Sequence, residues 1–185
     1  CNGNVLDISL TCNKADFCSA WYNTDFALMK LKDNIAQNTR LTWLGWDKTS
    51  NTPTCCTTIH HPQGDVMKIS TDYGSAISAS FNEQTDNGWY VDFDYGIAEH
   101  GSSGAPLLNL YNRVVGQLLG GIGYANPCNQ TGITFGKFHL SWNGGGHSYD
   151  RLSNWLDSIN TNQNTIDGYH PFAIEGNPHL FTREV

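Results

Sequence analysis

Apolar and polar residues alternate in short runs along most of this chain, and glycine-rich or polar turns separate the runs. Such alternation puts every second side chain on one face, which is typical of half-buried strands. The runs that predict strands are 26–31, 41–46, 56–61, 66–70, 77–81, 89–93, 107–110, 113–121 and 133–142. Many short strands with almost no helix predict an all-β barrel or sandwich.

The less regular segments complete this picture. Residues 1–22 are polar and predict a short strand followed by a cysteine-bearing loop, and residues 82–88 predict a polar connection. One helix is expected after Ser148, which can cap it, because apolar residues recur there at helical spacing. These apolar residues are Tyr149, Leu152, Trp155, Leu156 and Ile159. Residues 1–169 therefore predict one domain, and residues 170–185 a tail or linker.

The chain is acidic and carries six cysteines. With a net charge of -7 and no basic run, nucleic acid is not an expected partner. No apolar run approaches the roughly 20 residues that cross a bilayer, so no membrane span is expected. The cysteines lack the C-x-x-C spacing of a zinc site, which favours disulfides of undetermined pairing and a secreted, extracellular protein. Cys55 and Cys56 are adjacent, so we expect them on opposite faces of a strand.

Residues 101–106, Gly-Ser-Ser-Gly-Ala-Pro, hold a hydroxyl between glycines directly before a strand-like run. Acyl transfer needs a nucleophile and backbone N–H groups directed at the developing oxyanion, and glycines let the backbone turn tightly enough to supply both. Ser103 is therefore the candidate nucleophile. The same composition suits an ordinary surface turn, so the loop by itself leaves both interpretations open.

Asp25 precedes the first clear strand. A carboxylate there can cap a turn or, beside a histidine, fix the tautomer of the ring and stabilise the imidazolium. His60 and His61 suggest a metal site. However, adjacent strand residues face opposite ways and no third ligand stands nearby, so neither a metal nor another cofactor is expected.

The order of these features resembles that of chymotrypsin/trypsin-like serine proteases: an acid before a strand, a Gly-x-Ser-Gly-x-Pro loop, a strand ending in Gly-Gly, and a terminal helix. The closer resemblance is to the secreted bacterial lysyl endopeptidase family. The motifs that carry it are Thr24-Asp25-Phe26-Ala27-Leu28, Trp43-Leu44-Gly45-Trp46-Asp47, Ile59-His60-His61-Pro62 with Lys68-Ile69-Ser70, Gly101-Ser102-Ser103-Gly104-Ala105-Pro106, Arg113-Val114-Val115-Gly116-Gln117-Leu118, Ser141-Trp142-Asn143-Gly144-Gly145-Gly146 and Arg151-Leu152-Ser153-Asn154-Trp155-Leu156-Asp157.

The resemblance implies a double β-barrel, with an incomplete first and a complete second barrel, that hydrolyses peptide bonds through an acyl-enzyme. It makes Ser103 the nucleophile and Asp25 the acid of the triad, and it assigns the oxyanion hole to the N–H groups of Gly101 and Ser103. A strand edge would bind the extended peptide. This edge comprises Leu118, Leu119, Gly120 and Gly121. A monomer that acts on protein or peptide substrates is expected.

The histidine of the triad is the first departure from the family pattern. The family's general base precedes the acid, and no histidine stands before Asp25. The chain is therefore expected to be a C-terminal fragment with little activity of its own. His100 is too close to Ser103 along the loop to replace the base. Ser102 stands where many trypsin-like enzymes have an aspartate that pairs with a newly cut N-terminus. The lysyl endopeptidase family also has a serine there, so this position agrees with the closer resemblance.

The specificity pocket is the other departure. Lysine preference needs an acid in the pocket to meet the substrate ammonium. In the family that the chain resembles, this acid comes shortly before an aromatic-Gly pair, but Ile133 occupies that position before Phe135-Gly136. Leu119 also replaces a histidine that stacks on an aromatic ring in the family. We therefore do not expect lysine preference. Glu99 could line the pocket, and an apolar or mixed preference is left open.

A secreted serine endopeptidase is the leading expectation, and two other functions stay open. The missing histidine and Ile133 also suit an inactive pseudoprotease that binds peptides or glycans. A carbohydrate-binding domain would need exposed aromatic rings, which at strand spacing more commonly belong to a core. The candidate rings are Trp43, Trp46, Trp89 and Tyr90. Unpaired edges and missing disulfide partners predict that the isolated chain is marginally stable.

Overall fold

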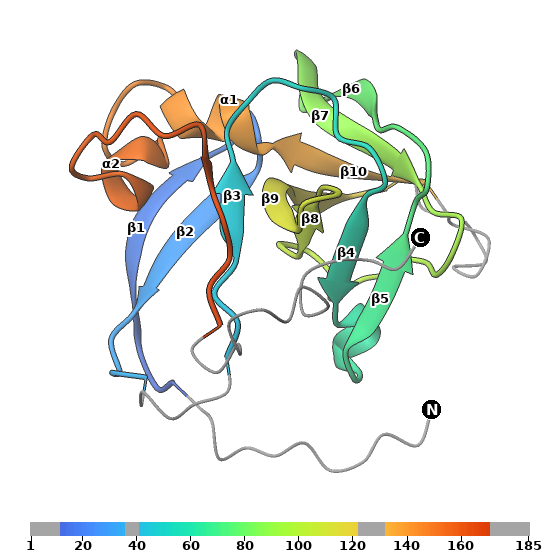
Figure 1. The fold of residues 1–185 in the computed structure, drawn as a ribbon, viewed down its shortest axis with the longest axis horizontal. Coiled ribbons are helices and arrows are strands. Elements are labelled where there is room, and N and C mark those ends of the chain that lie inside the picture. The colour runs from blue at the N-terminus through green and yellow to red at the C-terminus, as the bar shows by residue number, and fades with distance from the viewer. Residues whose placement is uncertain (1–11, 36–40, 122–131, 171–185) are drawn as a thin grey trace, which may run out of the picture.

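The computed structural model describes residues 12–35, 41–121 and 132–170, which form a mostly β fold (Figure 1). No helix in these residues is long and apolar enough to cross a membrane. The strands are β1 (Ala15–Trp21), β2 (Phe26–Leu31), β3 (Gly45–Asp47), β4 (Thr57–His60), β5 (Lys68–Thr71), β6 (Ile77–Phe81), β7 (Gln84–Asp92), β8 (Pro106–Leu108), β9 (Arg113–Gly120), β10 (Gly132–Lys137) and β11 (Thr165–Ile166). The helices are η1 (Pro62–Gly64), α1 (Phe138–Asn143) and α2 (Ser153–Leu156).

The strands form two sheets. β1 and β2 make a two-stranded antiparallel sheet, and the other strands make a nine-stranded sheet. The larger sheet runs in the order β5-β4-β8-β9-β10-β7-β6, and β3 joins β9 in parallel while pairing with β11. The predicted all-β class is confirmed. In the described residues the end strands β5 and β6 do not pair with each other, so the larger sheet is open rather than closed by hydrogen bonds.

The larger sheet surrounds one hydrophobic core. Side chains from β7, β8, β9 and β10, which span most of the sheet, meet in a single cluster, so the sheet curls around them. The buried members are Cys56, Ala76, Trp89, Val91, Phe93, Ala98, Leu107, Val115, Leu118, Ile133 and Phe135. Trp89, Val91 and Phe93 illustrate the two-residue period from which the strand was predicted.

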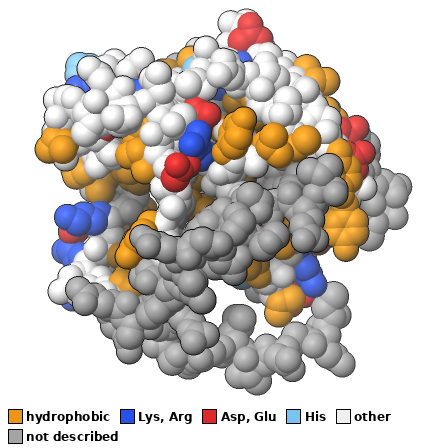
Figure 2. All heavy atoms as spheres, viewed as in Figure 1, with side chains coloured by type: hydrophobic (Ala, Val, Ile, Leu, Met, Phe, Trp, Pro, Cys, Tyr) orange, Lys and Arg blue, Asp and Glu red, His pale blue; other side chains and the backbone are white. Residues whose placement is uncertain are grey.

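A second core joins the β1–β2 hairpin to the larger sheet. Phe26 of β2 packs with Trp46, Phe138 and Trp142, and the rings of Trp46 and Trp142 lie 4.5 Å apart. The outer face of the hairpin exposes Phe17 and Met29, which are cross-strand partners. Hydrophobic side chains also lie at several separate places on the face shown in Figure 2.

The connection predicted at 82–88 is mostly strand. Asn82 and Glu83 have φ values of 50° and 60°, so they form a two-residue hairpin turn between β6 and β7. Positive φ at both central residues defines the type I′ turn, whose usual signal is Asn-Gly. Because Glu83 replaces that glycine, the turn was not recognised and β7 was predicted to start five residues late, at Trp89 rather than Gln84.

The predicted helices and strands near the end of the chain are also corrected. The strand predicted at 133–142 ends at Lys137, and α1 follows at once. The helix predicted after Ser148 is wrong except for the four residues of α2. Tyr149 and Ile159 are 62% and 82% exposed, so their apolar spacing does not mark a packed face. At the other end, part of the predicted cysteine-bearing loop is strand β1, and the strand predicted at 41–46 is reduced to β3.

The cysteines and aromatic residues agree only partly with expectation. Cys56 is fully buried while Cys55 is half-buried, so the pair faces different ways, but in a turn before β4 rather than in a strand. No disulfide joins Cys12, Cys18, Cys55 and Cys56 to one another within the described residues, which exclude Cys1 and Cys128. Trp46 and Trp89 are buried, whereas Trp43 is 49% exposed. The predicted tail lies outside the described residues except for its first residue.

A substitution at Gly136 tests the contact between β10 and the turn that joins β1 to β2. A Cβ at this position would overlap the carbonyl oxygen of Thr24 and the amide nitrogen of Gln117. We expect Gly136→Ala to lower the free energy of unfolding by about 1–3 kcal/mol, as overpacking usually does. Ser50→Ala, at an exposed loop position, should change it by less than about 0.5 kcal/mol. Equal urea midpoints for the two variants would show that the turn at Thr24 is not in close contact with β10 at Gly136.

Candidate active site

Two consecutive turns build the loop around Ser103. The Ser102 N–H donates to the Glu99 carbonyl at 3.1 Å, and the Ala105 N–H donates to the Ser102 carbonyl at 3.1 Å. The third residue of each turn is a glycine with positive φ, 93° at Gly101 and 82° at Gly104. This conformation is the one that a type II turn requires at that position. The second turn leaves Ser103 exposed, whereas Ser102 is buried.

The loop is fixed to β9 by its backbone. The Gly104 N–H donates to the carbonyl of Leu118 at 2.8 Å, and the Leu118 N–H donates to that of Ala105 at 2.8 Å. Within the described residues, the N–H groups of Gly101 and Ser103 have no protein acceptor. These are the two groups that the resemblance assigns to an oxyanion hole, and both remain available to an oxygen atom of a ligand.

The η1 turn supports the loop from the other side. The Gln63 N–H donates to the His100 carbonyl at 2.6 Å. A Cβ at Gly101 would come within 3.0 Å of the Gly64 nitrogen and of the His61 carbonyl oxygen. The backbones are therefore too close for a side chain at Gly101, which gives this glycine a packing role beyond its φ angle.

Asp25 is exposed in the turn between β1 and β2, with φ of 51° and its N–H donating to Tyr22 at 3.2 Å. The preceding residue, Thr24, anchors this turn. Its carbonyl accepts from the Gln117 side chain at 2.6 Å, and its hydroxyl accepts from Ser141 at 2.9 Å.

Gln117 directly precedes Leu118, the residue that holds the nucleophile loop. The turn that carries Asp25 and the loop that carries Ser103 are thus attached to adjacent residues of β9. Within the described residues no hydrogen bond joins Asp25 to Ser103.

The described structure brings no histidine ring into hydrogen-bonding contact with Ser103. His61 donates from Nδ1 to the Asp65 carbonyl at 2.9 Å, and His139 packs its ring on Trp89 at 5.9 Å. His100 is exposed, and its carbonyl oxygen is the group that contacts η1.

His60 is the site residue that sequence reasoning missed. It is 2% exposed, with Nδ1 2.8 Å from the Ser102 hydroxyl and Nε2 3.1 Å from the Ser70 hydroxyl. Burial lowers the pKa of His60 below 6.5, and His61 lowers it further while Glu99 acts in the opposite direction. The ring is therefore held neutral. The sequence signal for a buried histidine is the His-His pair itself, because adjacent side chains of a strand point to opposite faces and one of the two then faces the core.

The residues predicted to bind substrate lie in two settings. Leu118 and Ile133 are 3% and 4% exposed and pack in the main core, whereas Leu119 is partly exposed and Gly121 is exposed. Gly120 pairs with Thr134 of β10 on one edge of β9. On the other edge, β9 has no strand partner beyond Leu118 among the described residues, so that edge has room for an extended chain.

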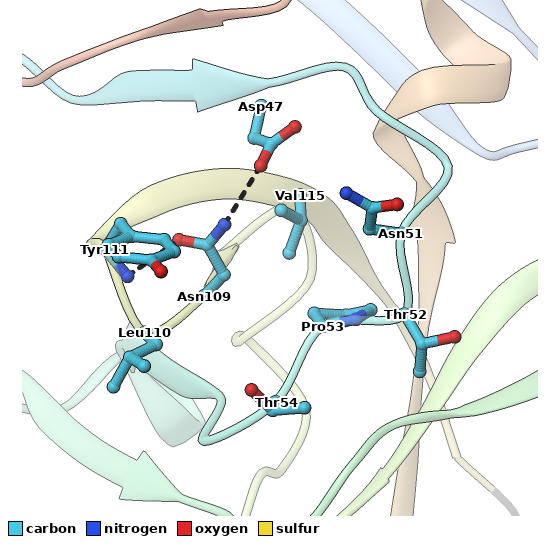
Figure 3. Close-up of a pocket in the computed structure, with 9 residues that line it drawn as sticks. All are labelled: Asp47, Asn51, Thr52, Pro53, Thr54, Asn109, Leu110, Tyr111 and Val115. Atoms are coloured by element: carbon cyan, nitrogen blue, oxygen red, sulfur yellow. Dashed lines mark hydrogen bonds between the residues drawn. The ribbon is translucent and has the colours of Figure 1, made fainter.

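A separate pocket of about 150 Å³ lies between the β3 loop and the turn after β8 (Figure 3). Its lining residues are Asp47, Asn51, Thr52, Pro53, Thr54, Asn109, Leu110, Tyr111 and Val115. Asn109 donates to the Asp47 carboxylate at 3.3 Å across it. None of the predicted site residues lines this pocket, and it holds neither a histidine nor a nucleophilic serine, so it is distinct from the candidate site.

A mostly β fold with an exposed serine in a Gly-x-Ser-Gly-x-Pro loop, anchored to the strand that also holds an acidic turn, is typical of trypsin-like serine proteases. The sequence places the chain more narrowly within this class. Residues 1–134 match the family described as "Lysyl endopeptidase, C-terminal domain", and the chain belongs to this family.

Solved structures of a mycobacterial protease are similar to this chain. The active form of the Rv3671c protease from M. tuberculosis is 17% identical over 81% of this chain and 60% of its own, with a TM-score of 0.48. The inactive form is 17% identical over 66% of this chain and 60% of its own, with a TM-score of 0.46. The chain thus spans about 60% of the length of these structures.

His60, which is buried, and His139, which is partly buried, predict how stability depends on pH. Burial lowers the pKa of His60 and of His139, so the unfolded chain binds protons there at higher pH than the folded chain. Stability is therefore complete above the ordinary histidine pKa of 6.5 and falls as the pH drops below it. Backbone hydrogen bonds lower the pKa of Asp157 from 3.8, which affects stability only in more acidic solution.

We expect the urea midpoint to fall between about pH 7.5 and about pH 5.5, and to fall less steeply when both histidines are replaced by glutamine. A midpoint that stays constant or rises across this interval would contradict a lowered pKa of the two rings in the folded chain.

Proposed function

We propose that this chain forms the Ser103 half of the active site of a secreted serine endopeptidase. One observation carries the proposal: Ser103 is exposed in a loop that backbone hydrogen bonds hold to β9, and the N–H groups of Gly101 and Ser103 have no acceptor among the described residues. Catalysis of acyl transfer depends above all on such preorganised donors at the position of the developing oxyanion.

The reaction would begin with attack of the Ser103 hydroxyl oxygen on the substrate carbonyl carbon. A histidine takes the hydroxyl proton, and the N–H groups of Gly101 and Ser103 hold the oxyanion. The C–N bond then breaks, the amine leaves with the proton from the histidine, and the ester on Ser103 remains. Water, deprotonated by the same histidine, attacks the ester carbonyl carbon. The bond to the Ser103 oxygen then breaks, the histidine returns the proton to that oxygen, and the acid is released.

We place this base outside the 185 residues, because no histidine precedes Asp25. Asp25 is assigned the role of orienting the base and stabilising its charged form. The attachment of its turn and of the nucleophile loop to neighbouring residues of β9 supports this assignment.

The substrate would lie along the free edge of β9 next to Leu119 and Gly120, as an added strand. Ile133 packs in the core and supplies no carboxylate. We therefore propose an apolar or mixed preference at the cleavage site rather than a preference for lysine.

Covalent labelling of the full-length protein with a fluorophosphonate tests the nucleophile. We expect one adduct, on Ser103, because only an activated hydroxyl reacts at an appreciable rate. Ser103→Ala should abolish labelling, while Ser50→Ala, which removes another exposed serine, should retain it. If the folded wild-type protein stays unlabelled, the endopeptidase proposal fails and a pseudoprotease takes its place.

Asp25→Asn in the full-length protein tests the acid. The substitution keeps the shape of the side chain but removes the charge that stabilises the protonated base, and we expect kcat to fall by about 10⁴-fold. Asp33→Asn, at an exposed position beyond the same hairpin, should leave kcat within about threefold of wild type. A similar kcat for both variants would remove Asp25 from the triad.

A further inference from the structure

A directed chain of hydrogen bonds runs from the core to the nucleophile loop. The Ser70 hydroxyl donates to the Ile97 carbonyl at 2.9 Å, so its oxygen is left to accept from the Nε2–H of His60 at 3.1 Å. Because a neutral imidazole carries one proton, Nδ1 must then be an acceptor. It accepts from the Ser102 hydroxyl at 2.8 Å. Each donor and each acceptor along the chain is satisfied in one direction only.

Ser102 is the residue that the two turns share. Its N–H closes the first turn at Glu99, and its carbonyl closes the second turn at Ala105. Gly101 and Ser103, whose N–H groups face no protein acceptor in the described residues, are its immediate neighbours. A fixed Ser102 side chain therefore fixes the peptide planes on both sides of it.

We propose that His60 is a positioning residue that holds the oxyanion loop in its working shape through the hydroxyl of Ser102. The inference rests on the proposed endopeptidase function and names what orders that site. His60 is itself anchored in β4, and its side chain is as deeply buried as that of Ser102, 2% exposed in each case. Ser102 thereby receives a neutral hydrogen-bond acceptor from within this chain.

Two substitutions at His60 separate the contact with Ser102 from the rest of the ring. In His60→Asn the side-chain oxygen can occupy the place of Nδ1 and still accept from Ser102. In His60→Gln the amide reaches toward Ser70 and leaves Ser102 without its acceptor. With the full-length protein and a peptide ester substrate, we expect His60→Gln to lower kcat by about 10- to 100-fold, because small misplacements of catalytic groups cost that much.

KM should change less than about threefold in His60→Gln, since the oxyanion forms only in the transition state. His60→Asn should keep kcat within about threefold of wild type. His139→Gln, which alters a partly buried histidine remote from the loop in sequence, should also do so. A His60→Gln enzyme with normal kcat, or a His60→Asn enzyme as slow as His60→Gln, would overturn the proposal.

A double-mutant cycle tests whether His60 acts through Ser102. Ser102→Ala should lower kcat about as much as His60→Gln, and the double variant should be no slower than the slower single variant. Independent, multiplying effects would contradict the proposed path.

The backbone amide resonances of Gly101 and Ser103 provide a readout without catalysis. They should shift alike in His60→Gln and Ser102→Ala and stay near wild type in His60→Asn. This readout decides the inference even if wild type fails to react with the fluorophosphonate, a result that would reject only the endopeptidase proposal. Unchanged amide resonances in both His60→Gln and Ser102→Ala would reject the inference itself.

Discussion

The hydrogen bonds made by Gln117 and Leu118 of β9 determine how the candidate site is assembled. The side chain of Gln117 binds the turn before Asp25, and the backbone of Leu118 binds the loop at Gly104 and Ala105. Two segments almost 80 residues apart in sequence are thus hydrogen-bonded to neighbouring residues of one strand. Because the core packs Leu118 and Phe135 tightly, this strand cannot shift without opening the centre of the molecule.

The way Ser102 is held follows from the energetics of buried groups. A buried ion pair must offset a desolvation cost of several kcal/mol per charge. When one of its two charged groups is absent, the other is left as an uncompensated buried charge. A neutral imidazole between two hydroxyl groups incurs no such cost, and each net hydrogen bond contributes about 1 kcal/mol. The chain through Ser70 also fixes the tautomer of His60. The arrangement suits a loop that must keep one shape rather than switch between two.

How much the sequence could predict depends on whether a feature was local. The alternation of Trp89, Val91 and Phe93 identified a strand, and the Gly-Ser-Ser-Gly composition identified an exposed serine loop, because both depend on near neighbours. The type I′ turn at Asn82 and Glu83 could not be predicted from the sequence, because its residues lack the usual glycine. The helical spacing after Ser148 predicted a helix longer than α2. Tyr149 and Ile159 are exposed to solvent, and a single sequence does not show which apolar residues are exposed and which are buried.

His60 shows the same limit at the site itself. Its neighbours in sequence suggested metal ligation, whereas its function in the structure comes from Ser70 and from Ser102, 42 residues away. A strand position explains why one histidine of the pair is buried, but not which groups it meets. A buried polar side chain must find partners, so His60 required at least one donor and one acceptor from elsewhere in the fold. Both partners are hydroxyl groups, and one belongs to Ser102 beside Ser103, so the contacts of this buried histidine reach the candidate active site.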